Sequence, residues 1–380
     1  MGKIQNFIIE LENQQGVYYP GQVVRGEIVL ELSEALKIRE IRITFRGEAY
    51  VDWPGSSSPY DETSGPKKGG FRLPSDDNYS ASEEYFNRTI PLFGNGRGEG
   101  DNNILPLGRH TFPFDFGLPD VLPSSFEGPW GYIRYVINAT LDRPWSFNTN
   151  YKRAFTLISP LDLNTQRNAM KTIYFSTAQK TRSLPKRVKN PLKRTATENK
   201  ISEVLVFPPK NPSRMETLKT RKLEKEVTRI SHPGVQGGES VVWKGMGLVI
   251  PPVPPSFLER CNIIDIRYFL KLVIGTLGSL SNLEIPIEVI IGTVPLRPQL
   301  VHQNAHAVVP SAPPMPVPSF ASDDQPPSYS ECVFGQNDIT DEEDNEHTQG
   351  LLKFAPVCIF YSNNQPHTNM VETPEAKVPI

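Results

Sequence analysis

Hydrophobic and polar residues alternate with a period of two along several stretches of this chain. Two long stretches have apolar residues at every second place: Ile133, Tyr135, Ile137, Ala139 and Leu141, then Ile264, Ile266, Tyr268, Leu270 and Leu272. Shorter alternations run over residues 7–11, 24–30 and 41–45, and residues 4–53 have no convincing helical period. Alternation puts one face of a strand on a core and the other toward solvent, as in antiparallel sandwiches. The pattern predicts an all-β protein.

The two long strands belong to a repeat. Residues 105–141 and 237–274 both contain an alternating strand, a proline-rich bend that ends in Ser-Phe, and a strand with Ile-Arg-Tyr. Tyr135 and Tyr268 lie 133 residues apart, and Phe126 and Phe257 lie 131 apart. A period of this size is too long for a solenoid unit and matches a duplicated domain. We therefore expect two related β-domains in tandem, with equivalent Ile-Arg-Tyr strands.

Composition restricts the class of protein. The formal net charge of −2 over 380 residues gives no global field for nucleic acid. No apolar run fits a signal peptide or a membrane span, so any membrane association is expected to be peripheral. Three widely spaced cysteines without a Cys-x-x-Cys pair argue against a disulfide framework and a zinc site, and favour the cytoplasm: Cys261, Cys332 and Cys358.

Two regions have the composition of poorly ordered chain. Residues 54–103 are rich in Gly, Ser, Asp and Asn, and we expect a long mobile loop with a strand around 85–92. Residues 299–380 are first proline-rich and then acidic, with few residues that could form a core. We expect this second region to be a disordered tail.

A series of motifs in one order resembles the arrestin domain-containing proteins, the alpha-arrestin group. The motifs are YYPGQVVRG, FRGEAYVDW, LPLGRHTFPFDF, LPSSFEG, GYIRYVINATLDRPW and YKRAFTLISPLDLN, then IPPVPPS, CNIIDIRYFLKL and IPIEVIIGTVPLR. The resemblance implies two arrestin-type, immunoglobulin-like β-sandwiches. We expect them over residues 1–165 and 166–298.

The second sandwich departs from this pattern. No second copy of YYPGQVVRGEI follows Leu163, and residues 180–235 are predicted to be a basic insertion. Between Lys180 and Arg229 stand fifteen Lys or Arg residues and five Glu. We expect a solvated linker, although docking to phosphorylated receptor tails or anionic lipid is a second interpretation. An incomplete sandwich, a rearranged one, alternative splicing and a gene-prediction error all stay open, and a missing hairpin would leave strand edges unpaired.

Two short motifs lie in the predicted tail. Pro326, Pro327 and Tyr329 form a PPxY motif, which presents two proline rings and a tyrosine to a WW domain. The family carries this motif at this place, so the resemblance implies that these residues bind a WW domain. Pro310, Ser311, Ala312 and Pro313 resemble a motif that a subunit of the ESCRT machinery binds. A proline-rich spacer is the alternative for this second motif.

Catalytic patterns are absent from the sequence. Its six histidines have no metal-ligand spacing, and it contains no Gly-x-Ser-x-Gly elbow, P-loop or dinucleotide fingerprint. We expect no enzyme activity, no metal and no cofactor.

Two functional hypotheses follow. In the first, the sandwiches bind a membrane-protein cargo and the PPxY motif recruits a HECT-type E3 ubiquitin ligase, so that cargo is ubiquitinated, internalised and sorted. Such an adaptor is cytoplasmic and is recruited to the plasma membrane and endosomes. In the second, the chain is a sorting-coat scaffold of the retromer type that needs no ligase. Binding of a WW domain to Tyr329 discriminates between the two hypotheses.

Overall fold

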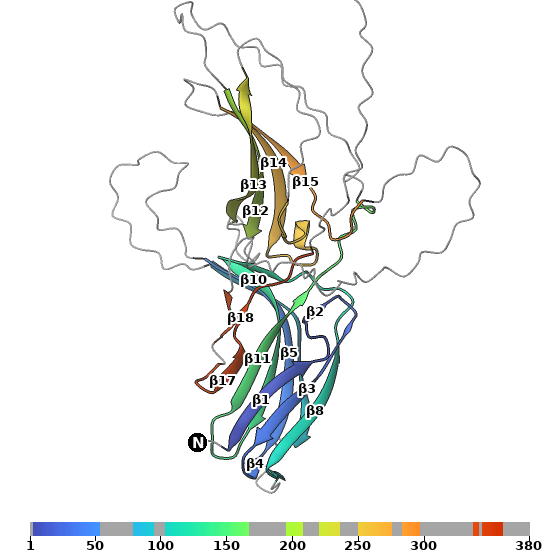
Figure 1. Ribbon diagram of the computed structural model, residues 1–380, viewed down its shortest axis with the longest axis vertical. Helices are drawn as coiled ribbons and strands as arrows, with labels where there is room; N and C mark the ends of the chain where they lie inside the picture. Colours follow the sequence, from blue (N-terminus) through green and yellow to red (C-terminus); the bar gives the residue numbers. More distant parts are fainter. Residues whose placement is uncertain are drawn as a thin grey trace, which may run out of the picture.

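The computed structural model is built almost entirely from β-strands. It describes residues 3–53, 79–94, 103–166, 195–207, 220–235, 250–275, 283–296, 337–341 and 344–359. Within these ranges the only helical element is the three-residue 3-10 turn η1 (Ser256–Leu258). No helix of the described residues is long and apolar enough to cross a membrane. The strands form two bodies that follow one another along the long axis (Figure 1).

The first body is a sandwich of two sheets. One sheet has the order β1-β3-β8, from β1 (Ile4–Leu11), β3 (Val23–Leu32) and β8 (Gly108–Gly117). The other has the order β17-β11-β10-β5-β6, from β5 (Glu40–Trp53), β6 (Tyr79–Gly94), β10 (Gly131–Asp142), β11 (Thr149–Leu157) and β17 (Thr348–Leu351). Short strands complete the body: β2 (Val17–Tyr18) beside β11, β9 (Phe126–Gly128) beside β10, and the pair β4 (Leu36–Ile38) and β7 (Asn103–Leu105).

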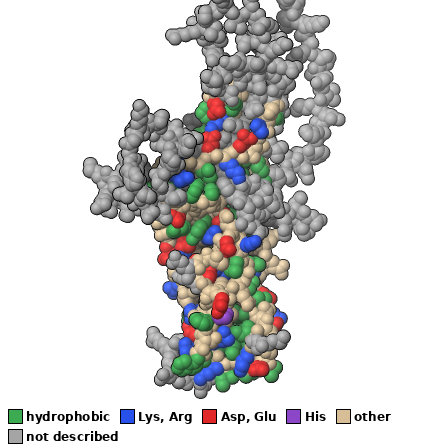
Figure 2. Space-filling model, turned by 90° about the vertical axis from the view of Figure 1, so that its left-hand side faces the viewer, with side chains coloured by type: hydrophobic (Ala, Val, Ile, Leu, Met, Phe, Trp, Pro, Cys, Tyr) green, Lys and Arg blue, Asp and Glu red, His purple; other side chains and the backbone are tan. Residues whose placement is uncertain are grey.

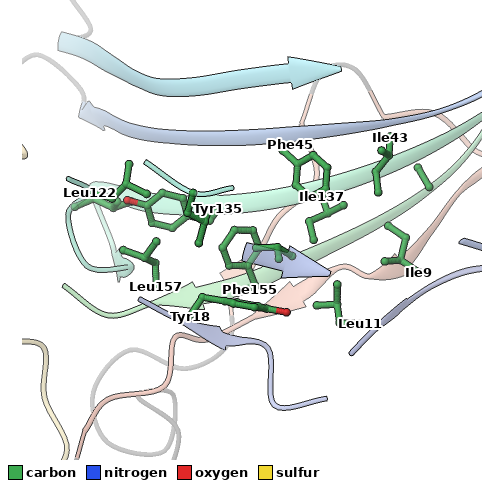
Figure 3. Packing of buried hydrophobic residues seen from close by; sticks show 14 of the residues in the cluster. Ile9, Leu11, Tyr18, Ile43, Phe45, Leu122, Tyr135, Ile137, Phe155 and Leu157 are labelled. Carbon is green, nitrogen blue, oxygen red and sulfur yellow. The ribbon is translucent and has the colours of Figure 1, made fainter. Parts of the chain in front are cut away.

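The core of the sandwich lies where the alternation predicts it. Along β5 every second side chain is buried, and the five apolar residues predicted to face inward on β10 are all 0% exposed. Figure 3 shows Tyr135 of β10 beside Leu122, Phe155 and Leu157. Its ring centroid lies 5.7 Å from that of Phe155, which in turn meets Tyr18 edge-on at 5.4 Å. Burial of each such side chain contributes about 1.5–3 kcal/mol to folding, so these strands hold the sandwich together.

The second body contains one four-stranded antiparallel sheet among the described residues. Its order is β13-β12-β14-β15, from β12 (Thr195–Phe207), β13 (Arg221–Val235), β14 (Asp265–Gly275) and β15 (Leu283–Val289). Ile264, Ile266 and Tyr268 are buried as predicted, whereas Leu270 and Leu272 are half-buried. The two Ile-Arg-Tyr strands, β10 and β14, lie in separate sheets. The predicted domain limits at residues 165 and 298 stay predictions.

The expectation of a basic insertion over 180–235 is wrong for its described part. Strands β12 and β13 pair from Thr195–Val235 to Phe207–Arg221, and β12 also pairs with β14 along its length. Exposed and half-buried positions alternate over residues 221–227 of β13, where Lys222, Glu224 and Glu226 are exposed and Leu223 and Val227 are partly buried. A strand with one solvent-facing side can carry a charge at every second position, so a count of charges does not exclude it.

Two other expectations concern the long loop and the C-terminal tail. The strand predicted around residues 85–92 is confirmed, and β6 extends it to sixteen residues paired with β5. The remainder of the predicted loop, residues 54–78 and 95–102, lies outside the described residues. The prediction of a wholly disordered tail is wrong for residues 337–341 and 344–359, which pack on the first sandwich. The pair β16 (Asn337–Asp338) and β18 (Lys353–Phe354) belongs to this segment.

Candidate interaction surfaces

The short motifs predicted from sequence lie outside the part of the chain that the structure describes. This holds for Pro326, Pro327 and Tyr329 of PPSY and for Pro310, Ser311, Ala312 and Pro313 of PSAP. Their binding roles therefore stay predictions. The described residues provide three other features: a duplicated hydrogen-bond pattern, a polar junction between the two bodies, and a docked C-terminal segment.

The repeated residues perform the same structural task in both bodies. The Tyr135 hydroxyl donates to the carbonyl oxygen of Pro123 at 2.7 Å, and the Tyr268 hydroxyl donates to that of Pro254 at 2.8 Å. The serine of each Ser-Phe pair binds the backbone of a later strand or strand end. Ser125 Oγ accepts from Leu157 N and Ser256 Oγ accepts from Ile291 N, both at 2.9 Å. Each tyrosine and serine thus tie a proline-rich bend to its own sheet.

The two copies differ in their other repeated residues. Phe126 is fully buried, whereas Phe257 is only half-buried in η1 and its neighbour Leu258 is buried in its place. The equivalence predicted for the two phenylalanines therefore does not hold. Arg134 forms a fork with the buried carboxylate of Glu127, with Nη2 to Oε2 at 2.9 Å, whereas Arg267 is half-exposed and pairs with Asp265 on its own strand. Only the first copy has a buried ion pair here.

A carboxylate on β6 joins the first body to the second. Glu83 is 8% exposed, and its two oxygens accept hydrogen bonds from Asn262 N at 3.1 Å and Asn262 Nδ2 at 2.8 Å. Beside it, burial raises the pKa of the Cys261 thiol and of the Tyr85 hydroxyl, so both groups stay neutral at physiological pH. A buried carboxylate with several donors fixes the relative position of the two elements that it joins.

The C-terminal segment docks on the outer face of the first sandwich. Strand β17 extends the larger sheet by pairing in parallel with β11 (Figure 1), from Asn150–Thr348 to Arg153–Leu351. Lys152 of β11 has a side chain that is only 5% exposed, and its Nζ lies 2.7 Å from Asp341 Oδ2 and 2.8 Å from Asp344 Oδ2. A buried ammonium group requires such partners, because its desolvation is costly without them.

Contacts continue on both sides of this ion pair. Asn337 Nδ2 donates to Glu127 Oε2 at 3.0 Å, and Ile339 is 2% exposed. Farther along, Val357 N donates to Thr156 Oγ1 at 3.1 Å, and Cys358 is buried near the junction of the two bodies. The sequence analysis missed this docked segment. The only signal for it was an acidic run, Asp341 to Asp344, whose partner lies about 190 residues away in the sequence.

Among the described residues no group of three or more His, Cys, Asp or Glu could hold a metal ion. The polar side chains named above contact one another as structural ion pairs and hydrogen bonds. Ile339 and Asp341 of the C-terminal segment line a cavity together with residues of β5, β10 and β11.

Comparisons with known proteins agree with this architecture. The family model described as "Arrestin (or S-antigen), N-terminal domain" matches residues 7–164, and that described as "Arrestin (or S-antigen), C-terminal domain" matches residues 183–296. The second match includes β12 and β13, so the basic hairpin belongs to the C-terminal arrestin domain.

Three relatives match over most of their length. Arrestin domain-containing protein 17 of Caenorhabditis elegans is 26% identical, over a match that covers 90% of this chain and 83% of the relative. Human arrestin domain-containing protein 4 is 29% identical, over a match that covers 77% of this chain and 72% of the relative. Mouse arrestin domain-containing protein 1 is 27% identical, over a match that covers 83% of this chain and 72% of the relative. The chain therefore belongs to the arrestin domain-containing family, with two arrestin β-sandwiches in tandem.

Proposed function

We propose that this chain is a cytoplasmic adaptor that brings a membrane-protein cargo to a HECT-type E3 ubiquitin ligase. The arrestin domains bind the cargo, and Pro326, Pro327 and Tyr329 bind a WW domain of the ligase. Ubiquitination then commits the cargo to endocytosis and endosomal sorting, which places the adaptor at the plasma membrane and endosomes. Family membership supports the general role of a trafficking adaptor. The PPSY motif is the observation that carries the link to a ligase.

The docked C-terminal segment supports this division of labour. Tyr329 precedes Asn337 by eight residues, and Asn337 hydrogen-bonds to Glu127 of the first sandwich. Eight residues span at most about 28 Å, so a ligase bound at PPSY stays close to the arrestin domains. Such a tether raises the effective concentration of the ligase at a bound cargo, without chemistry from the adaptor itself.

The PSAP motif gives the adaptor a second contact in the same pathway. We infer that Pro310, Ser311, Ala312 and Pro313 bind the ESCRT subunit that recognises such motifs, which would pass ubiquitinated cargo to the sorting machinery. A pull-down of that subunit with tail peptides, with and without Pro313→Ala, tests this contact separately. Equal recovery with both peptides would reduce PSAP to a spacer.

A titration of tail peptides against isolated WW domains tests the ligase contact. Tyr329→Ala should weaken binding roughly thirty-fold, because an aromatic anchor of this kind contributes about 2 kcal/mol. Pro327→Ala should weaken it similarly. Ser328→Ala is the matched control and should change little, because this side chain is expected to face away from the groove. Equal affinity of the wild-type and Tyr329→Ala peptides would favour a retromer-type scaffold that needs no ligase.

A further inference from the structure

The end of the first sandwich that points away from the second body, marked by β4 in Figure 1, exposes apolar side chains. The four most exposed large apolar side chains of the described residues all lie at this end, and we call them the apolar tip: Ile104 at 59%, Leu107 at 70%, Trp145 at 99% and Phe147 at 70%. Figure 2 shows apolar side chains beside Lys and Arg side chains at the lower end of the molecule. Single exposed apolar residues are common on soluble proteins, whereas a cluster of them at one place marks a site of interaction.

Backbone contacts bring the parts of the apolar tip together. Strands β4 and β7 pair with Ile104 opposite Lys37, and both of these side chains are exposed. Arg39 directly follows β4, and its N–H donates to the carbonyl oxygen of Asp142 at 2.9 Å. Asp142 is the last residue of β10, so the loop from β10 to β11 begins beside the pair of β4 and β7. The tip is therefore one surface, built from β7, the connection from β7 to β8, and the β10–β11 loop.

The β10–β11 loop holds Trp145 in solvent. Its φ of +59° lies in the left-handed region, which few residues other than Gly, Asn and Asp adopt. Arg143 spans the loop, because its Nη2 donates to the carbonyl oxygen of Phe147 at 3.4 Å and to Thr149 Oγ1 at 3.3 Å. The ring centroid of Phe147 also lies 5.9 Å from that of His347. None of these contacts uses the Trp145 side chain, so its strained backbone and full exposure indicate a role outside the fold.

Basic side chains border the apolar tip. Lys37 forms no ion pair with a carboxylate of the described residues. The Lys3 side chain is 53% exposed and lies 3.6 Å from Glu34. The Arg109 side chain is 56% exposed and lies 3.8 Å from Glu10. Exposed ion pairs of this kind contribute little to stability, so these cations can exchange a carboxylate for a lipid phosphate.

This combination fits a lipid surface better than a protein surface. A protein binds apolar anchors in pockets of matching shape, which requires a fixed mutual arrangement of the anchors. The tip instead presents its side chains from two loops and one strand at the end of the molecule. A fluid bilayer needs no matching pockets, and it accepts Trp and Phe at the depth of its headgroups and Lys and Arg beside anionic lipids.

We propose that the apolar tip is a peripheral membrane anchor that inserts into the headgroup region of an anionic bilayer. Trp145 enters deepest, because it is the most exposed side chain of the tip, and Lys37 contacts lipid phosphate. Strand β10 has 12 residues of about 3.3 Å each, so the junction with the second body lies up to roughly 40 Å from the lipid. The anchor is separate from PPSY and PSAP and does not depend on the proposed ligase contact.

Co-sedimentation of full-length protein with lipid vesicles tests the proposal. Wild type should bind vesicles of phosphatidylcholine with about one third phosphatidylserine, and should bind pure phosphatidylcholine more weakly. Trp145→Asn should weaken binding roughly tenfold, and its fold should stay intact because Asn tolerates a positive φ. Absence of binding by wild type, or equal binding by Trp145→Asn, would overturn the proposal.

Two exposed aliphatic residues at opposite ends of the sandwich provide a matched comparison. Leu107 belongs to the tip, whereas Val121, 55% exposed, lies in the bend before β9 near the second body. Leu107→Asn should weaken vesicle binding and Val121→Asn should not. An equal loss in both variants would contradict the tip as the site of insertion.

Charge and insertion are measured separately. Lys37→Gln should weaken binding to the anionic vesicles about fivefold, whereas Lys222→Gln, at an exposed lysine of β13 in the second body, should not. Equal losses would contradict a contact of Lys37 with lipid. Tryptophan emission should shift to shorter wavelength when vesicles are added, and Trp145→Phe should still bind but lose this shift. A shift that persists in Trp145→Phe would contradict insertion of Trp145.

A second copy of the chain is the other partner that an apolar tip could take. Sedimentation velocity of wild type and Trp145→Asn measures self-association. We expect both forms to sediment alike without vesicles. Self-association that Trp145→Asn abolishes, together with no binding to vesicles, would overturn the membrane anchor and make the tip an interface between copies.

Discussion

Tyr135 and Tyr268 lie 133 residues apart and make the same contact, a hydroxyl hydrogen bond to the carbonyl oxygen of a buried proline in the preceding bend. The two distances, 2.7 Å and 2.8 Å, are those of ordinary strong O–H···O bonds. The relationship explains why the Ile-Arg-Tyr sequence and the proline-rich bend recur together. The tyrosine of each copy needs the bend as an acceptor, and the bend needs the tyrosine to satisfy its carbonyl group.

Removal of either hydroxyl should destabilise its own domain. Tyr135→Phe and Tyr268→Phe each leave a buried carbonyl oxygen without its donor, and we expect a loss of about 1–2 kcal/mol in the free energy of unfolding. Hydrogen exchange resolved by domain measures where the loss falls. Tyr132→Phe is the control, because its hydroxyl binds Glu48, whose side chain is 19% exposed and keeps its ion pair with Arg46, at 3.2 Å. Equal effects of Tyr135→Phe on both domains would contradict two independent copies of the contact.

Glu127 should give the first domain a measurable pH dependence. Burial raises the pKa of its carboxyl group, and the hydrogen bonds from Arg134 and Asn337 oppose this shift without cancelling it. A carboxyl group whose pKa is raised on folding contributes stability below its unfolded pKa, and this contribution is lost as pH rises through the folded pKa. We therefore expect the unfolding free energy of wild type to fall relative to Glu127→Gln as pH rises from about 4 toward 7.

Urea unfolding of the two proteins at several pH values measures this difference. Only the difference isolates Glu127, because other carboxyl groups titrate over the same range in both proteins. A wild-type stability that rises relative to Glu127→Gln over this range would mean that the ion pair with Arg134 outweighs burial.

Strand β12 should be the better protected strand of the basic hairpin. It lies between β13 and β14, so its amide groups face a partner on both sides, whereas β13 is at the edge of the sheet. In hydrogen-exchange mass spectrometry we expect peptides within residues 195–207 to exchange more slowly than those within 221–235. If the peptides of both strands exchange at the rate of an unfolded chain, the segment is a solvated linker and the hairpin is wrong.

The sequence predicted the strands whose side chains alternate and missed those whose burial depends on distant residues. The inward faces of β10 and of the first half of β14 could be predicted because period two is a local property. The hairpin of β12 and β13 was missed because its charged positions concealed the same alternation. Strand β17 has four residues, which are too few for a periodic signal. Asp341 and Asp344 bind Lys152, which lies about 190 residues earlier in the sequence, so no local pattern reveals this contact. The PPSY motif at Tyr329 is a short pattern of neighbouring residues that does not depend on the fold, so the sequence alone suggested it.

The most direct test of the adaptor asks whether cargo binding and ligase recruitment reside in different parts of the chain. Full-length wild type and Tyr329→Ala are expressed in cells and captured after crosslinking, and mass spectrometry quantifies captured membrane proteins and the ubiquitin remnants on them. The account predicts that both forms capture the same membrane proteins and that the remnants on these proteins fall with Tyr329→Ala. Unchanged remnants on the captured cargo would contradict it.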